Sequence, residues 1–555
     1  MMSNEIVGSQ TPVNRNVDVV IMGGGLAGLT LALQLRRRFP SLSIQVLERH
    51  VYPVSVAAHK IGESTVEIGA RYLADVLDLK EHLVSSQLNK FGFRFFFSEG
   101  QRELNKVTEI GVSRALRTPS YQIDRGVFEN FLADHVRTNG IELIDDARVT
   151  EVGLIEPEQE ATAEQAHQIE WSRQSESHRT SARWVIDASG RAGLIKRKLG
   201  LAQTNDHAAY AVWFRIKGTI RIDDWVDDPA WKARCDPPAR WLSTNHLVGA
   251  GYWVWLIPLS SGHHSIGIVA DPRHHPINRM NTFDKAMDWL EEYQPRLFDD
   301  LDGRREDVID FVSFKRFSYG CKQVFSQDRW ALTGEAGLFL DPFYSPGTDF
   351  IAISNTFITE LVARDNARER LGAHAHTYDQ LYQSFYQSTL ALYVDQYAIF
   401  GDPEVLPRKV IWDYTYYWGV LSQLFFQERL ADLSMLSQLR EELSHCQALN
   451  LAMQRFLREW STLSNKSNPA VMHDQALLPW FAQLNASLLD QLDADQFRQR
   501  IKASSRQLTR LAWELVQRAT ADYPSIDPTG LKAAIAAMPG ATDHRLSDAE
   551  PLLTF

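Results

Sequence analysis

The sequence predicts an α/β protein with an inserted antiparallel sheet and a C-terminal helical region, and three observations support this fold class. First, a β-branched run, a glycine-rich turn and a run with helical spacing follow one another near the N-terminus. Second, residues 205–325 alternate aromatic and aliphatic side chains between turn signals, which is typical of antiparallel strands. Third, residues 366–540 place leucines and aromatic residues at helical spacing.

The same changes in pattern divide the 555 residues into segments. At about 100–200 residues per domain, this length is enough for three structural units. We expect a mobile N-terminus at 1–16, the first part of a nucleotide-binding domain at 17–204, an antiparallel-sheet domain at 205–325, a return segment of the nucleotide-binding domain at 326–365, a helical domain at 366–540 and a mobile tail at 541–555.

Composition excludes several classes of protein. Lys and Arg number 58 against 69 Asp and Glu, a formal net charge of −11 that disfavours a broad nucleic-acid-binding surface. The three cysteines lie far apart without metal-ligand spacing, so we expect a reducing compartment and no metal site. No window reaches the roughly 18–20 apolar residues of a membrane helix, and no signal-peptide pattern is present. We therefore expect a cytoplasmic protein without a membrane span.

The first element is a buried parallel strand at 17–22, followed by the turn Gly23-Gly24-Gly25-Leu26-Ala27-Gly28 and a helix at 29–38. In this GxGxxG pattern Gly23 allows a tight turn, Gly25 lets the backbone approach a pyrophosphate, and Gly28 packs helix against strand. The phosphates would meet the helix N-terminus near Leu26 and Ala27. A second strand at 43–47 ends at Glu48 and Arg49, and Glu48 is placed to accept the ribose hydroxyls. NAD and FAD share this pattern, so it leaves the choice of cofactor open.

Four later segments resemble the FAD-contacting segments of the glutathione-reductase-type flavoprotein fold. They are Tyr121-Gln122-Ile123-Asp124-Arg125, Ala147-Arg148-Val149, the run from Val185 through Asp187 to Arg191, and the run from Trp330 through Gly334 and Glu335 to Ala336. The resemblance implies FAD as cofactor, with Arg125, Val149, Asp187, Gly334 and Glu335 among its contacts. Glu335 stands where that family usually has Asp.

A second dinucleotide-binding loop is not evident. Gly249-Ala250-Gly251 precedes a strand rather than a helix, so we interpret it as a hairpin turn. We therefore expect a separate flavin reductase to supply the electrons.

Three further motifs resemble the flavin-dependent halogenases, in particular the phenol- and pyrrole-type members. The segment Trp253-Val254-Trp255-Leu256-Ile257-Pro258 matches the family's signature. Because residues i and i+2 of a strand share a face, we expect Trp253 and Trp255 to form one aromatic wall of the active site, with Pro258 at its end. Lys60-Ile61-Gly62-Glu63-Ser64 resembles a loop beside the flavin, with Ser64 as a contact. Lys90-Phe91-Gly92 resembles the segment of the catalytic lysine. The resemblance implies that reduced FAD, oxygen and halide give hypohalous acid, which Lys90 holds beside the substrate; Lys60 is the second candidate.

The segment Asp341-Pro342-Phe343-Tyr344-Ser345-Pro346-Gly347-Thr348 resembles the family's halide and flavin loop. This implies a chloride or bromide site at Ser345, Gly347 and Thr348, with Gly347 also touching the flavin. Two positions depart from the pattern. Tryptophan-specific members have Glu where Tyr344 stands, which favours a phenol- or pyrrole-type substrate here. Pro346 has no N–H, although the family usually offers one to the halide at that position.

Several alternatives remain open on the sequence. The enzyme could hydroxylate rather than halogenate an aromatic ring, could reduce a double bond, or could bind flavin without chemistry. The substrate is expected to be a phenol, pyrrole or indole, either free or attached to an acyl carrier protein. A cluster of aromatic residues between Tyr393 and Phe426 predicts either helix core or the lining of a substrate pocket.

Overall fold

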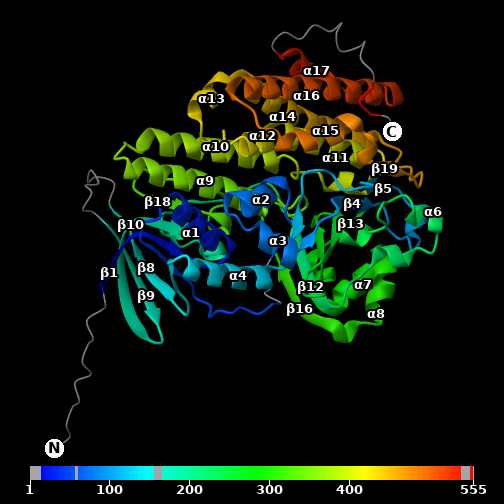
Figure 1. Ribbon diagram of the computed structural model, residues 1–555. Coiled ribbons are helices and arrows are strands. Elements are labelled where there is room, and N and C mark those ends of the chain that lie inside the picture. The colour runs from blue at the N-terminus through cyan, green and yellow to red at the C-terminus, as the bar shows by residue number, and fades with distance from the viewer. Residues whose placement is uncertain (1–13, 57–60, 156–165, 539–550, 554–555) are drawn as a thin grey trace, which may run out of the picture.

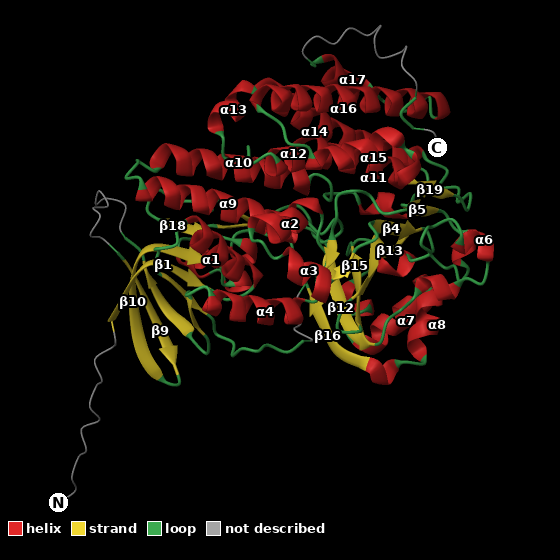
Figure 2. Ribbon diagram, viewed as in Figure 1, coloured by secondary structure: helices red, strands yellow, loops and turns green. Residues whose placement is uncertain are grey.

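The computed structural model describes residues 14–56, 61–155, 166–538 and 551–553. Two β-sheets lie side by side beneath a stack of long helices (Figure 1). Figure 2 shows that the chain beyond α9 (Gly347–Asn366) is almost entirely helical. This arrangement agrees with the α/β class predicted from the sequence.

The first sheet has seven strands in the order β7-β2-β1-β10-β9-β8, with β18 also paired to β10. The pairs of β1 with β2 and β10, of β2 with β7 and of β10 with β18 are parallel. The strands are β1 (Asn14–Met22), β2 (Ile44–Leu47), β7 (Glu142–Ile144), β8 (Arg148–Gly153), β9 (His167–Arg173), β10 (Glu176–Asp187) and β18 (Trp330–Leu332). Strand β1 begins at Asn14, so the end of the predicted mobile N-terminus is instead paired with β10.

Helices α1 (Leu26–Arg38), α4 (Arg125–Thr138) and α9 pack around this sheet, as expected for a nucleotide-binding βαβ unit. Short elements connect the two sheets. They are α2 (Glu67–Arg71), the π-helical turn η1 (Tyr72–Val76), α3 (Lys80–Ser86), α5 (Leu194–Lys198), the ribbon of β3 (Leu88–Asn89) with β6 (Tyr121–Gln122), and the ribbon of β11 (Ala202–Gln203) with β17 (Gly320–Cys321).

The second sheet has eight strands in the order β16-β12-β15-β14-β13-β4-β5-β19. They are β4 (Phe93–Phe96), β5 (Glu109–Gly111), β12 (Tyr210–Lys217), β13 (Thr244–Gly249), β14 (Tyr252–Pro258), β15 (His263–Ala270), β16 (Val308–Phe314) and β19 (Met472–Asp474). Helices α6 (Pro229–Lys232), α7 (Phe283–Tyr293) and α8 (Pro295–Asp302) belong to the same half of the protein. The turn at Gly249–Gly251 joins antiparallel β13 and β14, which confirms the predicted hairpin.

This sheet corrects one predicted boundary. The sequence assigned it to residues 205–325 alone, but β4 and β5 precede that range and β19 lies far beyond it. Strand β13 pairs in parallel with β4, and β19 pairs in parallel with β5. Such pairings join residues far apart in the chain, so no local pattern indicates them.

The helical region also differs from expectation, because it is not a separate domain. Its helices and the first sheet share one contiguous buried core that extends from Val19 to Leu553. Leu552 and Leu553, in the predicted mobile tail, are buried, and their N–H groups donate to Glu514. The remaining helices are α10 (Gly372–Leu390), α11 (Val405–Tyr416), the π-helical turn η10 (Tyr417–Leu421), α12 (Ser422–Phe426), α13 (Leu433–Gln438), α14 (Arg440–Leu463), α15 (Pro479–Ala486), α16 (Ala494–Asp522) and α17 (Thr529–Ala536).

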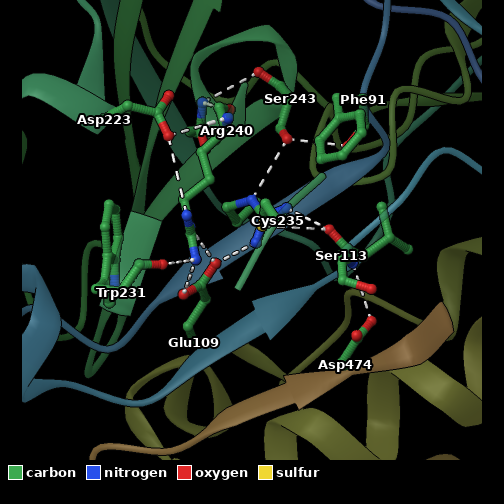
Figure 3. A network of polar contacts seen from close by, with 12 residues as sticks. Phe91, Glu109, Ser113, Asp223, Trp231, Cys235, Arg240, Ser243 and Asp474 are labelled. Carbon is green, nitrogen blue, oxygen red and sulfur yellow. Dashed lines mark hydrogen bonds and ion pairs between the residues drawn. The ribbon is translucent and has the colours of Figure 1, made fainter. Parts of the chain in front are cut away.

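A buried network of ion pairs and hydrogen bonds connects β4 and β5 to neighbouring segments (Figure 3). Glu109 accepts hydrogen bonds from the guanidinium groups of both Arg94 and Arg240, and Arg240 also faces Asp223. Arg94, Arg240 and Glu109 are at most 1% exposed. Because β4 alternates its side chains, Arg94 points into this network while Phe93 and Phe95 point to the opposite face. The network therefore fixes the strand that follows Lys90.

Within the described ranges, no helix is long and apolar enough to cross a membrane. The same residues contain no group of three or more His, Cys, Asp or Glu that could hold a metal ion.

Candidate active site

A cavity of about 560 Å³ lies between the two sheets. It opens where the parallel strands β1 and β10 end, the place where ligands bind in open α/β sheets. Most of the predicted cofactor residues line it, namely Gly23, Gly25, Leu26, Ala27, Glu48, Arg49, Ser64, Arg125, Val149, Gly334, Glu335 and Gly347. The cavity therefore brings together motifs that are spread over more than 300 residues.

The glycine-rich turn fits a dinucleotide. Gly23 has φ +120°, a conformation that favours glycine, and a Cβ there would lie 2.2 Å from the carbonyl oxygen of Ala188. A Cβ at Gly25 would meet no atom within 4 Å, so the backbone faces open space. Gly28 does not line the cavity; a Cβ there would lie 2.0 Å from the Gly23 carbonyl oxygen. Its role is to let α1 approach the turn, as the motif predicts.

Two charged residues frame the turn. Glu48 Oε2 accepts from Gly24 N at 2.6 Å and Oε1 accepts from His50 N at 2.8 Å, so the carboxylate is held rigidly at the cavity wall. Arg125 is buried, which lowers its pKa to about 10 and still leaves it cationic at neutral pH. Its Nε is buried without a hydrogen-bond partner among the described residues. Its Nη1 and Nη2 donate to Ile61 O and Glu129 Oε1, so Nε is the remaining N–H at the cavity wall, and it fits the anionic part of FAD.

Two other predicted residues lie outside the cavity. Asp187 accepts hydrogen bonds from Ser189 N, Ser189 Oγ and Ile195 N, so it shapes the turn after β10 rather than contacting the cavity. Pro258 ends β14 opposite His264 and does not reach the wall that the sequence predicted for it. Glu335 lines the cavity but pairs with Arg191, with Oε2 3.0 Å from Arg191 Nε.

Trp253 and Trp255 form one aromatic wall of the cavity, with ring centroids 5.7 Å apart. Trp255 crosses over Gly267, where a Cβ would lie 2.2 Å from its ring. The sequence analysis missed His246, which also lines the cavity and contacts Trp253. Burial lowers the pKa of His246 to about 3, with the positive charge of Lys90 as a smaller cause, so the imidazole stays neutral. The hairpin register pairs His246 with Trp255, and this pairing could have been counted back from the predicted turn.

The wall is connected to the halide loop. Trp253 Nε1 donates to the Tyr397 hydroxyl at 3.2 Å, and Tyr397 donates to Asp341 Oδ2 at 2.5 Å. His207 Nε2 lies 2.6 Å from the same oxygen. Tyr397 belongs to the helical region, so that region fixes both the wall and the first residue of the loop.

Lys90 lies beside the cavity rather than in it. Its Nζ donates to Ser64 Oγ at 2.9 Å and to Thr65 O at 3.0 Å, and it stands 3.3 Å above the centroid of the Phe93 ring. Burial lowers the pKa of Lys90 to about 7, against the opposing carboxylates of Glu67 and Asp349. Both charge states are therefore populated near neutral pH. Lys60, the second candidate, lies outside the described residues.

The predicted halide loop leads into α9. Ser345 has φ +51° and its N–H donates to Pro342 O, so this amide is not free for a halide. Pro346 caps the helix, and Gly347 and Thr348 supply the first helical N–H groups, which lack carbonyl partners in the helix. All four residues line the cavity. Gly347 and Thr348 therefore present the first amides of α9 at the cavity wall.

A second, smaller cavity of about 60 Å³ lies on the helical side of the loop. Pro346 and Phe350 line both cavities, so they separate them. Tyr393, Tyr414, Tyr416 and Tyr417 of the predicted aromatic cluster line it, whereas Trp412, Trp418, Phe425 and Phe426 are core residues. Part of the cluster is therefore helix core and part of it lines a cavity. Phe93, the ring beneath Lys90, also faces this cavity.

These features are those of a dinucleotide-binding enzyme with a smaller second cavity that Pro346 and Phe350 separate from the cofactor cavity. A family model described as tryptophan halogenase matches residues 106–399, and one described as NAD(P)-binding Rossmann-like domain matches residues 21–84. The chain belongs to the tryptophan halogenase family of FAD-dependent enzymes. This assignment favours the halogenase prediction over the hydroxylase alternative.

Individual relatives agree with the family. The chain is 26% identical over 446 residues to the flavin-dependent halogenase chlA of Dictyostelium discoideum, covering 74% of this chain and 71% of that protein. It is 24% identical over 354 residues to the 1H-pyrrole-2-carbonyl-[peptidyl-carrier protein] chlorinase of Pseudomonas fluorescens, covering 60% and 73%. The crystal structure of halogenase PltM in complex with phloroglucinol and FAD shares the fold, with a TM-score of 0.61, 16% identity and coverage of 93% and 98%.

Proposed function

We propose that this protein halogenates a small electron-rich aromatic ring, a phenol or pyrrole, with reduced FAD, oxygen and chloride or bromide. The observation that carries the proposal is the position of Lys90. Its partner Ser64 lines the flavin cavity, and the Phe93 ring beneath it lines the second cavity. A lysine between the two cavities can take halogen from one and present it to a ring in the other.

The roles of the remaining residues follow from the same geometry. Bound FAD supplies the reducing equivalents with which oxygen and halide give hypohalous acid. Gly347 and Thr348 hold the halide, and Trp253 and Trp255 keep an organic ring away from the flavin. Ser64 and Thr65 accept both N–H groups of a neutral Lys90 amine, which leaves its lone pair for the halogen.

Two features concern partners and location. The pyrrole relative acts on a ring attached to a carrier protein, which supports a carrier-bound substrate as the alternative to a free phenol. We propose a separate flavin reductase as the electron source, because the GAG segment forms a hairpin. All three cysteines are free and buried, which supports a reducing compartment such as the cytoplasm.

Product mass spectrometry tests this function. Purified protein is given FAD, a flavin reductase, NADH, oxygen and either chloride or bromide, with phenols and pyrroles offered free and, for pyrrole-2-carboxylate, on a carrier protein. We expect products with the isotope pattern of the added halide. Products that gain only oxygen in the presence of halide would contradict the proposal.

A further inference from the structure

The second cavity contains an acidic group that the proposed function leaves without a role. The Tyr344 hydroxyl donates to Asp413 Oδ2 at 2.8 Å, and both side chains line the cavity. Tyr344 comes from the halide loop and Asp413 from α11, so the loop and the helical region meet at this bond. The sequence analysis singled out Tyr344 because it stands where tryptophan-specific members have Glu; the structure places a carboxylate next to its hydroxyl.

A buried network of hydrogen bonds holds the Asp413 side chain in place. Lys409 Nζ lies 2.8 Å from Oδ2 and 2.6 Å from Gln454 Oε1, while Gln454 Nε2 donates to Oδ1 at 2.7 Å. The Lys409 and Asp413 side chains are 0% and 2% exposed. Burying such a pair costs several kcal/mol per ion, so it is weak evidence of stabilisation. A buried ion pair at the wall of a cavity is instead a candidate for chemistry.

Burial also makes Asp413 a stronger base than an exposed aspartate. It raises the pKa of the carboxyl group, and the neighbouring Lys409 ammonium opposes that rise. The Tyr344 hydroxyl already donates its hydrogen to Asp413, so its oxygen lone pairs remain to accept a proton from the cavity.

An independent feature also points to a ligand here. The helix that begins as α11 changes to a π-helical turn at η10, and Tyr417 and Leu421 of this turn line the cavity. Such turns are frequent at functional sites. At about 60 Å³ the cavity is smaller than the roughly 150 Å³ that encloses benzene. It therefore takes the reacting edge of one ring, or a whole ring only after side chains move.

We propose that Tyr344 and Asp413 accept the proton that a small phenol loses from its ring during halogenation, a role that rests on the proposed function. The Lys90 amine first takes the halogen from hypohalous acid: a nitrogen–halogen bond forms, the halogen–oxygen bond breaks, and the hydroxide leaves with one proton of the amine as water. A ring carbon then forms a bond to this halogen, and the nitrogen–halogen bond breaks. The electron pair of the ring C–H bond then returns to the ring. Its proton passes to Tyr344 Oη, whose own proton moves to Asp413 Oδ2. That proton replaces the one that the Lys90 nitrogen lost, which restores the amine.

A deuterium isotope effect tests this role. The probe is 4-methylphenol, with hydrogen or deuterium on its ring carbons, offered with bromide to the wild type and to Asp413→Asn. We expect no isotope effect in the wild type, because proton loss is fast. In Asp413→Asn we expect turnover to fall by about 10²-fold, with a normal isotope effect, because proton loss becomes limiting. Asp413→Glu should restore part of the rate and remove the isotope effect.

Two controls separate this role from a structural one. Tyr414→Phe removes a hydroxyl from the same cavity and should change turnover without an isotope effect. FAD absorbance of each variant shows whether the flavin site is intact, and bromination of monochlorodimedone reports the oxidant independently of the ring step. We expect Asp413→Asn to match the wild type in both.

The outcomes distinguish the two proposals. Absence of an isotope effect in Asp413→Asn, or a wild type that brominates monochlorodimedone but not 4-methylphenol, would overturn the role of Tyr344 and Asp413. A wild type that brominates neither compound would instead overturn the proposed function.

Discussion

The two cavities on either side of Pro346 are built in different ways. The flavin cavity is bounded by glycine turns and backbone groups, and the residues that make it come from short motifs. The smaller cavity is bounded largely by tyrosine side chains: Tyr414, Tyr416 and Tyr417 come from the continuous helix of α11 and η10, Tyr393 from the turn after α10, and Tyr344 from the halide loop. Phosphates need close backbone approach, which only special sequences permit, whereas a ring needs shaped apolar walls that many sequences can provide. Substitutions in the flavin cavity should therefore affect FAD binding, and substitutions in the smaller cavity should affect halogenation of the aromatic ring.

The largest expected effect comes from Lys90, which we propose passes halogen between the two cavities. Lys90→Met should lower aromatic halogenation by about 10³-fold, the scale of a positioned catalytic group, because no amine remains to present the halogen. Bromination of monochlorodimedone should persist, since Lys90 does not line the flavin cavity. Equal loss of both activities would place Lys90 in the flavin half-reaction and would contradict the division.

Next in size is a change on the flavin side. Gly28→Ala puts a Cβ 2.0 Å from the Gly23 carbonyl oxygen, so α1 must shift away from the turn. An overpacking cost of about 1–3 kcal/mol corresponds to roughly 5- to 150-fold weaker FAD binding, measured by fluorescence titration of the apoprotein. Gly303→Ala is the matched control, because its Cβ meets no atom within 4 Å at an exposed helix end. FAD affinity unchanged in Gly28→Ala would show that the turn tolerates a side chain.

A smaller effect comes from the charge of Lys90. Since burial lowers its pKa to about 7, the ammonium form dominates below pH 7 and the amine above it. Only the amine has a lone pair for halogen, so turnover of 4-methylphenol should rise through about pH 7 and then level off. Lys90→Arg should lose this rise. Turnover that falls through pH 7 would assign the oxidant to the ammonium form.

The smallest expected effect concerns the halide. Asp349 lies in the first turn of α9, where its charge opposes an anion at Gly347 and Thr348. Burial raises its pKa to about 7, so the opposition grows as the pH rises above 7. Asp349→Asn should lower the KM for bromide about two- to fivefold at pH 8, from about 0.3–1 kcal/mol, and less at pH 6. An unchanged KM would place the halide away from this helix end.

The sequence predicted the flavin side well because its chemistry is local. The spacing of Gly23, Gly25 and Gly28 and the acid at Glu48 lie within one βαβ unit. The aromatic wall at Trp253 and Trp255 followed from strand alternation alone. Asp187 and Pro258 were assigned to the cavity from motif position, and the structure shows that they support neighbouring turns and strands instead.

The substrate side could not be predicted in the same way. Asp413 and Lys409 are four residues apart on α11, and this spacing is typical of an ion pair on the surface of a helix. Only the fold places Asp413 against Tyr344, 69 positions earlier in the chain. The partner of β4 and the return of β19 depend equally on contacts between distant residues.

The position of β19 has a consequence for synthesis of the protein. Its residues 472–474 pair with the outer edge of β5, which lies some 360 residues earlier in the chain and is therefore translated first. While the ribosome translates the intervening chain, that strand edge has no partner and can pair with other chains. We therefore expect nascent chains to need protection until β19 emerges, and expression at low temperature or with a chaperone to raise the yield of folded protein.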